Sequence, residues 1–172
     1  MQNPLEITLK KKKLLFYYQE NDSTCGVGAG RSHLINCHGI PLSEKEIIEK
    51  AEISSSRHTI LKDGLDVPNW QKLAKELNLN FSEDVSGNID NLVRLTKDGI
   101  LPIIHRPSEI DGEGHYIIVY EANHMISFFD PYNEFGGLKK ENREEFYQKW
   151  YSPELKERWY MFLTKKYLQR KK

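Results

Sequence analysis

The chain has 172 residues, a length that favours one domain with a substantial buried core, and its composition of 38% hydrophobic and 29% charged residues is typical of a globular protein. Its 25 basic residues are balanced by 25 acidic residues, so we expect no nucleic-acid partner. No run of about 18 apolar residues and no signal-peptide pattern is present, so we expect a cytoplasmic protein without membrane insertion.

The early part of the chain predicts mainly helices. The lysines at 10–13 indicate only an exposed strand flank, because one short basic run is weak evidence for nucleic-acid binding. A helix is expected at 26–37, although three glycines weaken its first turns. A clearer helix covers 43–53, where Ser43 and Glu46 have the spacing of a capping box. Apolar stripes predict two further helices, at 67–79 and 89–99.

The pattern changes after the last of these helices. The apolar run 100–106 predicts a buried strand, and 115–133 holds two runs rich in aromatic and β-branched residues around a turn, which predicts a β-hairpin. A helix is expected at 140–150 and a final strand at 157–166. Helices followed by an antiparallel sheet make an α+β domain, which we take as one unit over residues 1–172.

Cys25 lies where a thiol can become a nucleophile. Only the thiolate reacts well, and the ordinary cysteine pKa of about 8.5 must be lowered for it to form at neutral pH. The start of the helix expected after Cys25 favours an anion, and a histidine must supply the second effect. His115 is the best candidate, because it opens a strand directly after the flexible sequence DGEG. His105 and His124 are the alternatives if the strand register differs.

An acceptor and an oxyanion donor complete this group. Asp130 ends the second strand of the expected hairpin, so pairing across the sheet brings its carboxylate near His115. Gln19 precedes Cys25 by six residues, and its amide is placed to reach the carbonyl oxygen that the Cys25 backbone N–H contacts. Cys37 is expected to be a small core residue, with both thiols free. Together, Cys25, His115, Asp130 and Gln19 predict covalent catalysis by a cysteine.

The stretches QENDSTCGVGAG and GHYIIVYEANHMISFFDPYN resemble the papain-like cysteine peptidases of the C39 group, which remove double-glycine leader peptides from bacteriocin precursors. The likeness extends over roughly residues 14–164. It implies a papain-like fold, in which an N-terminal helical part packs on an antiparallel β-sheet. It also implies that Cys25 is the nucleophile, His115 the general base and acid, Asp130 the residue that orients it, and Gln19 the oxyanion donor.

Two features differ from the usual pattern of that group. Thr24 precedes Cys25 where an acidic residue is usual, and the helix start is rich in glycine rather than in larger apolar residues. The expected function is hydrolysis of a peptide bond in a peptide or protein substrate, with no cofactor and no metal. Two alternatives stay open. One is a thiol acyltransferase or amidase on the same scaffold, and the other is a peptide-binding module without turnover.

Overall fold

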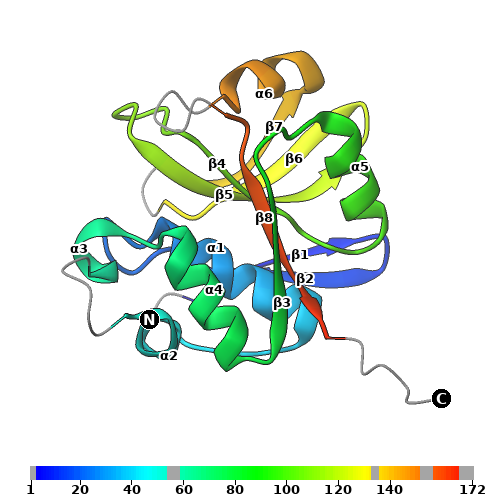
Figure 1. The fold of residues 1–172 in the computed structure, drawn as a ribbon. Coiled ribbons are helices and arrows are strands. Elements are labelled where there is room, and N and C mark those ends of the chain that lie inside the picture. The colour runs from blue at the N-terminus through cyan, green and yellow to red at the C-terminus, as the bar shows by residue number, and fades with distance from the viewer. Residues whose placement is uncertain (1–2, 54–58, 133–135, 152–156, 167–172) are drawn as a thin grey trace.

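The structure is a computed structural model that describes residues 3–53, 59–132, 136–151 and 157–166. The elements in chain order are β1 (Leu5–Leu9), β2 (Lys12–Phe16), α1 (Cys25–His33), the π-helix η1 (Leu34–His38), α2 (Glu44–Ala51), α3 (Ile60–Asp63), α4 (Val67–Glu76), β3 (Leu79–Asp84), α5 (Ile89–Lys97), β4 (Ile103–Pro107), β5 (Gly114–Ala122), β6 (Met125–Asp130), β7 (Gly137–Asn142), α6 (Arg143–Lys149) and β8 (Tyr160–Lys165). Figure 1 shows α1 to α4 grouped on one side of the sheet, while α5 and α6 lie on the other.

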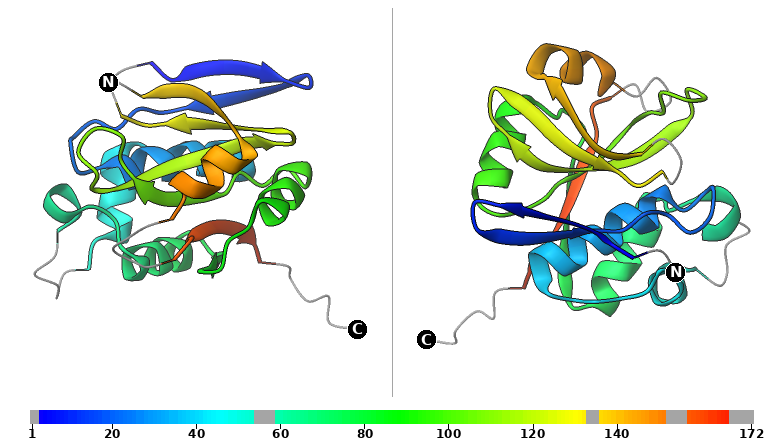
Figure 2. Two further views of the ribbon diagram at one scale, coloured as in Figure 1. Left: turned by 90° about the horizontal axis from the view of Figure 1, so that it is seen from above. Right: turned by 180° about the vertical axis from the view of Figure 1, so that it is seen from behind.

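The described residues form one six-stranded antiparallel sheet in the order β3-β8-β4-β5-β6-β7. β1 and β2 form a separate hairpin that lies against α1 and the sheet (Figure 2). Its Phe16 ring stacks on Phe129 of β6, with the ring centroids 5.0 Å apart. The predicted α+β class is confirmed. Within the described ranges, no helix combines the length and apolarity that crossing a bilayer requires.

Both faces of the sheet are buried. Side chains alternate along β5, so Ile118 packs with α1 and α4, whereas Ile117 packs on the opposite face with α5 and α6. Burial on both sides explains why β5 reads as a nearly continuous apolar run rather than as an alternating one. The sheet therefore separates two hydrophobic clusters of the described residues, and its open ends are left to carry polar side chains.

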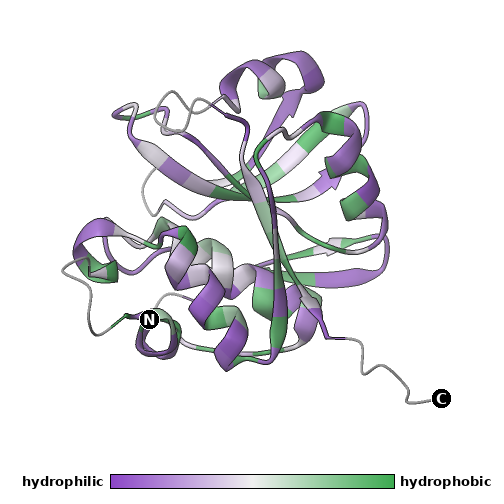
Figure 3. Cartoon of the chain, in the orientation of Figure 1, coloured by the Kyte–Doolittle hydropathy of each residue, from purple (hydrophilic) through white to green (hydrophobic). Residues whose placement is uncertain are grey.

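Local signals place the helices where the sequence predicts them. The capping box of α2 is present, since the Ser43 hydroxyl accepts a hydrogen bond from the Glu46 backbone N–H at 3.2 Å and the Glu46 carboxylate accepts one from the Ser43 backbone N–H. Asp66 and Asn69 form the same reciprocal box at α4, whereas at α5 the Asn88 side chain only accepts a hydrogen bond from the Asn91 backbone N–H. Figure 3 shows hydrophilic and hydrophobic residues interleaved along α4 and α5. This pattern is typical of helices that cover a core with one side.

Several strands lie outside the predicted pattern. β1 and β2 flank a turn in which Lys10 and Lys11 have φ values of 48° and 69°. β1 alternates apolar and polar residues (LEITL), the pattern of a half-buried strand, whereas β2 begins with two lysines (KKLLF). The helix expected at 67–79 ends at Glu76, and its last expected residue, Leu79, is the first residue of β3. The helix expected at 140–150 starts only at Arg143, because residues 137–142 pair with β6 as β7. Pairing with a neighbouring strand overrides helix propensity at these positions.

Glycines allow α1 to approach its neighbours closely. A Cβ atom at Gly30 would lie 2.6 Å from Cη2 of Trp70 in α4, and one at Gly28 would lie 3.0 Å from Cβ of Pro131, directly after β6. A larger residue would force these elements apart. The glycine-rich start of the helix therefore has a steric reason, which is the tight packing of α1 between α4 and the end of β6.

Candidate active site

The loop from residue 17 to 24 is held on several sides and fixes the position of Cys25. Its Gln19 backbone N–H donates to the Pro131 carbonyl at 2.8 Å. Glu44 of α2 is 3% exposed, and its carboxylate accepts hydrogen bonds from the Glu20 backbone N–H at 2.9 Å and from the Asn21 amide at 3.0 Å. The loop is thus joined both to the sheet and to α2, so it leads into α1 along one defined path.

Cys25 is the first residue of α1, and Thr24 is its N-cap. The Thr24 hydroxyl donates to the Asn21 carbonyl at 2.8 Å instead of capping the helix. The N–H groups of the first helical turn are therefore left to face a ligand or an anion near the Cys25 sulfur. A helix N-terminus of this kind stabilises a thiolate. In this structure Thr24 orders the preceding turn.

His115 and Asp130 meet at one end of the sheet. The His115 Nε2 atom lies 2.8 Å from Asp130 Oδ1. Asp130 Oδ1 also accepts a hydrogen bond from the Tyr132 backbone N–H at 3.0 Å, and Oδ2 accepts one from Lys139 Nζ at 3.1 Å. Burial alone would raise the pKa of Asp130, but the His115 contact and these neighbours hold it below its usual range. Asp130 is therefore an ionised acceptor for the imidazole.

His115 also interacts with Cys25. The two side chains line the same pocket, and because Nε2 is directed at Asp130, Nδ1 is the ring nitrogen left for the thiol. Burial disfavours the charged imidazolium, but the hydrogen bond with Asp130 and the interaction with Cys25 outweigh it and raise the pKa of His115 to about 9. At neutral pH the imidazole is consequently protonated beside the sulfur.

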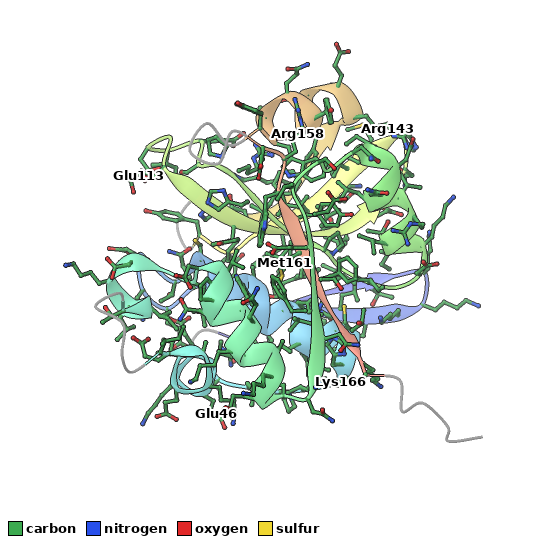
Figure 4. All side chains as sticks on the ribbon, in the orientation of Figure 1. Glu46, Glu113, Arg143, Arg158, Met161 and Lys166 are labelled. Carbon is green, nitrogen blue, oxygen red and sulfur yellow. The ribbon has the colours of Figure 1, made fainter. Side chains whose placement is uncertain are left out.

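The pocket next to Cys25 has a volume of about 410 Å³. α3 and the loop between β4 and β5 lie on the same side of the molecule in Figure 1, and both contribute to its walls. Glu113 marks the end of that loop in Figure 4. Among the described residues that line the pocket, the carboxylates outnumber the single lysine, Lys62. These carboxylates belong to Asp22, Asp63, Asp111 and Glu113.

Gln19 is buried in the loop that precedes Cys25 and is not one of the described residues that line the pocket. It is 3% exposed, and its side-chain amide donates to the carbonyls of Asn21 at 3.0 Å and Asp22 at 2.9 Å. The amide is thus engaged with the loop that leads to Cys25. Its predicted contact with an oxyanion stays a prediction.

The other histidines occupy different places. His105 lines the pocket, and its ring stands nearly perpendicular to that of Tyr116, with the centroids 5.0 Å apart. His124 is exposed in the turn at the opposite end of the β5–β6 hairpin. The pairing register therefore selects His115 as the partner of Asp130.

The second cysteine is half-buried at the edge of the core rather than inside it. Both cysteines are free thiols, and Cys37 packs against the larger hydrophobic cluster. Its sulfur lies 3.7 Å from Nδ1 of His33, which is fully buried. His33 Nδ1 is 2.7 Å from the Leu101 carbonyl oxygen, and its Nε2 accepts from the Leu163 N–H at 3.1 Å. The two ring nitrogens thus bind α1 to the segment before β4 and to β8.

Lys139 contacts Asp130, although nothing in the sequence alone singles it out as a site residue. It lies on β7 in the run GLKKEN, whose charges indicate only an exposed surface. No spacing relative to Asp130 marks it, because the two residues meet only when β6 and β7 pair.

Comparison with known proteins identifies the family and the fold. The model of the peptidase C39 family matches residues 13–155, whereas no curated protein sequence matches the chain. The fold is similar to that of the peptidase domain of Streptococcus ComA, a bi-functional ABC transporter involved in a quorum sensing pathway, with a TM-score of 0.65, 18% identity, and coverage of 87% of this chain and 97% of that chain. A C39-like peptidase from Bacillus anthracis gives a TM-score of 0.65, 17% identity, and coverage of 94% and 98%.

The peptidase domain of Streptococcus mutans ComA is also similar, with a TM-score of 0.53, 16% identity, and coverage of 87% of this chain and 98% of that chain. At these identities the solved structures establish the papain-like fold and nothing finer. The family model covers far more than half of the sequence, and the protein therefore belongs to the peptidase C39 family.

Proposed function

We propose that the protein is a cysteine peptidase in which Cys25 is the nucleophile, His115 the general acid and base, and Asp130 the residue that orients His115. The observation that carries the proposal is the shared pocket of Cys25 and His115, with the imidazole held by Asp130 at 2.8 Å. This arrangement supports a nucleophile next to a base that is itself oriented by an acceptor, which is what covalent acyl transfer requires.

The reaction begins with a thiolate and an imidazolium. The Cys25 sulfur attacks the carbonyl carbon of the peptide bond, and the carbonyl electron pair moves to oxygen. His115 gives its proton to the leaving amine as the C–N bond breaks, which leaves a thioester on Cys25. Neutral His115 then takes a proton from water as the water oxygen attacks the thioester. Release of the acid product restores the thiolate and the imidazolium.

The negative oxygen of the intermediate needs donors. We assign this role to the Cys25 backbone N–H at the start of α1 and to the Gln19 amide. Gln19 lies in the loop that precedes Cys25, and its amide donates to Asn21 and Asp22 carbonyls of that loop. The assignment therefore requires the amide to exchange one of these acceptors for the oxyanion when substrate binds.

The substrate is a peptide or protein segment with positive charge near the cut bond. The pocket walls carry the four carboxylates of the described lining residues against Lys62, which produces a negative field at the mouth of the cleft. A flexible peptide reaches the sulfur between α3 and the β4–β5 loop.

Mass spectrometry of synthetic peptides incubated with the protein tests the proposed function. We expect Cys25→Ala and His115→Ala to lower kcat/KM by at least about 10³-fold. Cys37→Ala, which removes the other thiol, serves as the matched control and should remain near the parent value. Full activity of Cys25→Ala would refute the proposal.

The same experiment separates the alternatives. Products that carry an added amine in place of a new carboxylate would assign acyl transfer rather than hydrolysis. The rate of Cys25 alkylation against pH, measured in the Cys37→Ala protein, identifies a module without turnover. In that case the thiol would titrate like free cysteine, near about 8.5, and no peptide would be cut.

A further inference from the structure

Asp130 divides its two carboxylate oxygens between two cationic partners. Oδ1 faces His115 Nε2 at 2.8 Å, and Oδ2 accepts from Lys139 Nζ at 3.1 Å. The register explains this, because Lys139 pairs with Phe128 and so lies on the same face of β7 as Asp130 does on β6. The Lys139 side chain is only 28% exposed and that of Asp130 13%, so water screens the contact weakly.

Lys139 is itself shared with a second carboxylate. Its Nζ lies 3.4 Å from Glu109 Oε2, in the loop between β4 and β5. Glu109 also contacts Lys149 at 2.9 Å and Arg106 at 3.4 Å. The charge of Lys139 is therefore distributed between the acceptor of the imidazole and a carboxylate on the loop that borders the pocket.

We propose that Lys139 is a positioning residue that limits how strongly Asp130 holds the proton on His115, and that Glu109 opposes it by drawing part of the Lys139 charge away. The inference rests on the proposed function of Cys25, His115 and Asp130. An ammonium beside Asp130 weakens the negative potential that the carboxylate produces at the imidazole. Removal of Lys139 strengthens that potential, and removal of Glu109 weakens it.

Other charged groups around His115 act on the same proton. They come from every element packed around the ring and, apart from Cys25, are left unsubstituted in the titration variants below. They are Cys25 on α1, Asp130 on β6, Asp111 and Glu113 in the β4–β5 loop, Arg106 on β4, Glu141 on β7, Lys149 on α6, and Asp22, Lys62, Asp63 and His105 around the pocket.

The two half-reactions make opposite demands on His115. Formation of the thioester needs an imidazolium that protonates the leaving amine, whereas its hydrolysis needs a neutral imidazole that accepts a proton from water. An imidazole that holds its proton too tightly slows the second step. Lys139 therefore keeps the basicity of His115 within a range that serves both steps.

Titration of His115 by nitrogen-detected NMR tests the inference without requiring turnover. The Cys25→Ala protein is the background, because it removes the thiol from the titration. We expect Lys139→Met to raise the pKa of His115 by about 0.5 to 1 unit and Glu109→Gln to lower it by a few tenths. Lys139→Arg, which keeps the charge, should preserve the parent pKa. Lys140→Met is the matched control on the neighbouring, exposed residue.

The double variant Lys139→Met/Glu109→Gln checks that the two residues act through each other. The Glu109→Gln effect should shrink once Lys139 is absent, since the two substitutions share a contact. In the active protein, Lys139→Met should move the rising limb of the kcat profile to higher pH by the shift that NMR measures.

The result that overturns the inference is an unchanged His115 pKa in folded Lys139→Met protein, or an equal change in Lys140→Met. If Lys139→Met does not fold while Lys139→Arg does, the Glu109→Gln titration decides. In that variant the pKa of His115 must still be lower than in the parent. A shift of the expected sign in a protein that cuts no peptide would leave the inference standing and refute the proposed function instead.

Discussion

The imidazole of His115 and the carboxylate of Asp130 meet at 2.8 Å although the residues are fifteen positions apart in the chain. The register of β5 and β6 pairs Ile118 with Phe129, which places His115 diagonally across from Asp130 on the same face of the sheet. A one-residue shift of this register would place the His115 and Asp130 side chains on opposite faces of the sheet. The hairpin register is thus a condition for the chemistry that we propose.

Gln19→Ala is expected to lower kcat by about 10²-fold with little change in KM, because an oxyanion donor acts mainly on the transition state. Since its amide also orders the loop before Cys25, Glu44→Ala is the control that loosens the same loop from the α2 side. Steady-state kinetics and the thermal midpoint are measured for both. Equal losses of kcat that follow the loss of stability would assign Gln19 to loop structure alone.

Stability should depend on pH through His115. Its pKa is raised from 6.5 to about 9 in the folded protein, so the protonated form stabilises the fold in full below about pH 6.5, and this contribution is lost as the pH rises through about 9. Since one pKa unit corresponds to about 1.4 kcal/mol, the loss is on the order of 3 kcal/mol.

Urea unfolding of the parent and of His115→Gln across this pH range measures that loss. The difference between the two curves isolates His115 from the other groups that titrate. We expect the parent to lose more stability than the variant with rising pH. Parallel curves would show that His115 binds its proton no more tightly in the folded state than in the unfolded one.

The carboxylates of the pocket should select cationic substrates. For peptides that differ at one position near the cut bond, kcat/KM should be about tenfold higher with lysine than with glutamate at low salt, and added salt should reduce the ratio. Asp111→Asn with Glu113→Gln removes two of the wall charges while leaving Cys25 and His115 in place. An unchanged preference in that variant would mean that these charges do not contact the substrate.

Gly30→Ala should destabilise the protein by about 1 to 3 kcal/mol, because the added methyl group meets the Trp70 ring. Trp70→Phe makes room at the same place at the cost of some packing. The double variant should recover part of the loss, so that the two effects are not additive. Urea unfolding measures all four proteins. Strict additivity would indicate that α1 accommodates the methyl group by another route.

The local signals of the sequence determined the elements that need only their own residues. Ser43 and Glu46 cap α2 because they are three positions apart, whatever the rest of the chain does. The aromatic and β-branched runs on both sides of residues 121–124 likewise predict the hairpin that carries His115 and Asp130. Resemblance to a peptidase family then named the residues that this hairpin and the start of α1 bring to one pocket.

Contacts between distant segments decided the rest. β7 is a strand because β6 pairs with it, and this pairing, not its charged sequence, carries Lys139 to Asp130. The buried position of Gln19 follows from contacts of its loop with Pro131, directly after β6, and with Glu44 of α2. Side-chain spacing along a chain records helices and turns, whereas the partners of a charge depend on strand register and packing, which only the folded chain sets.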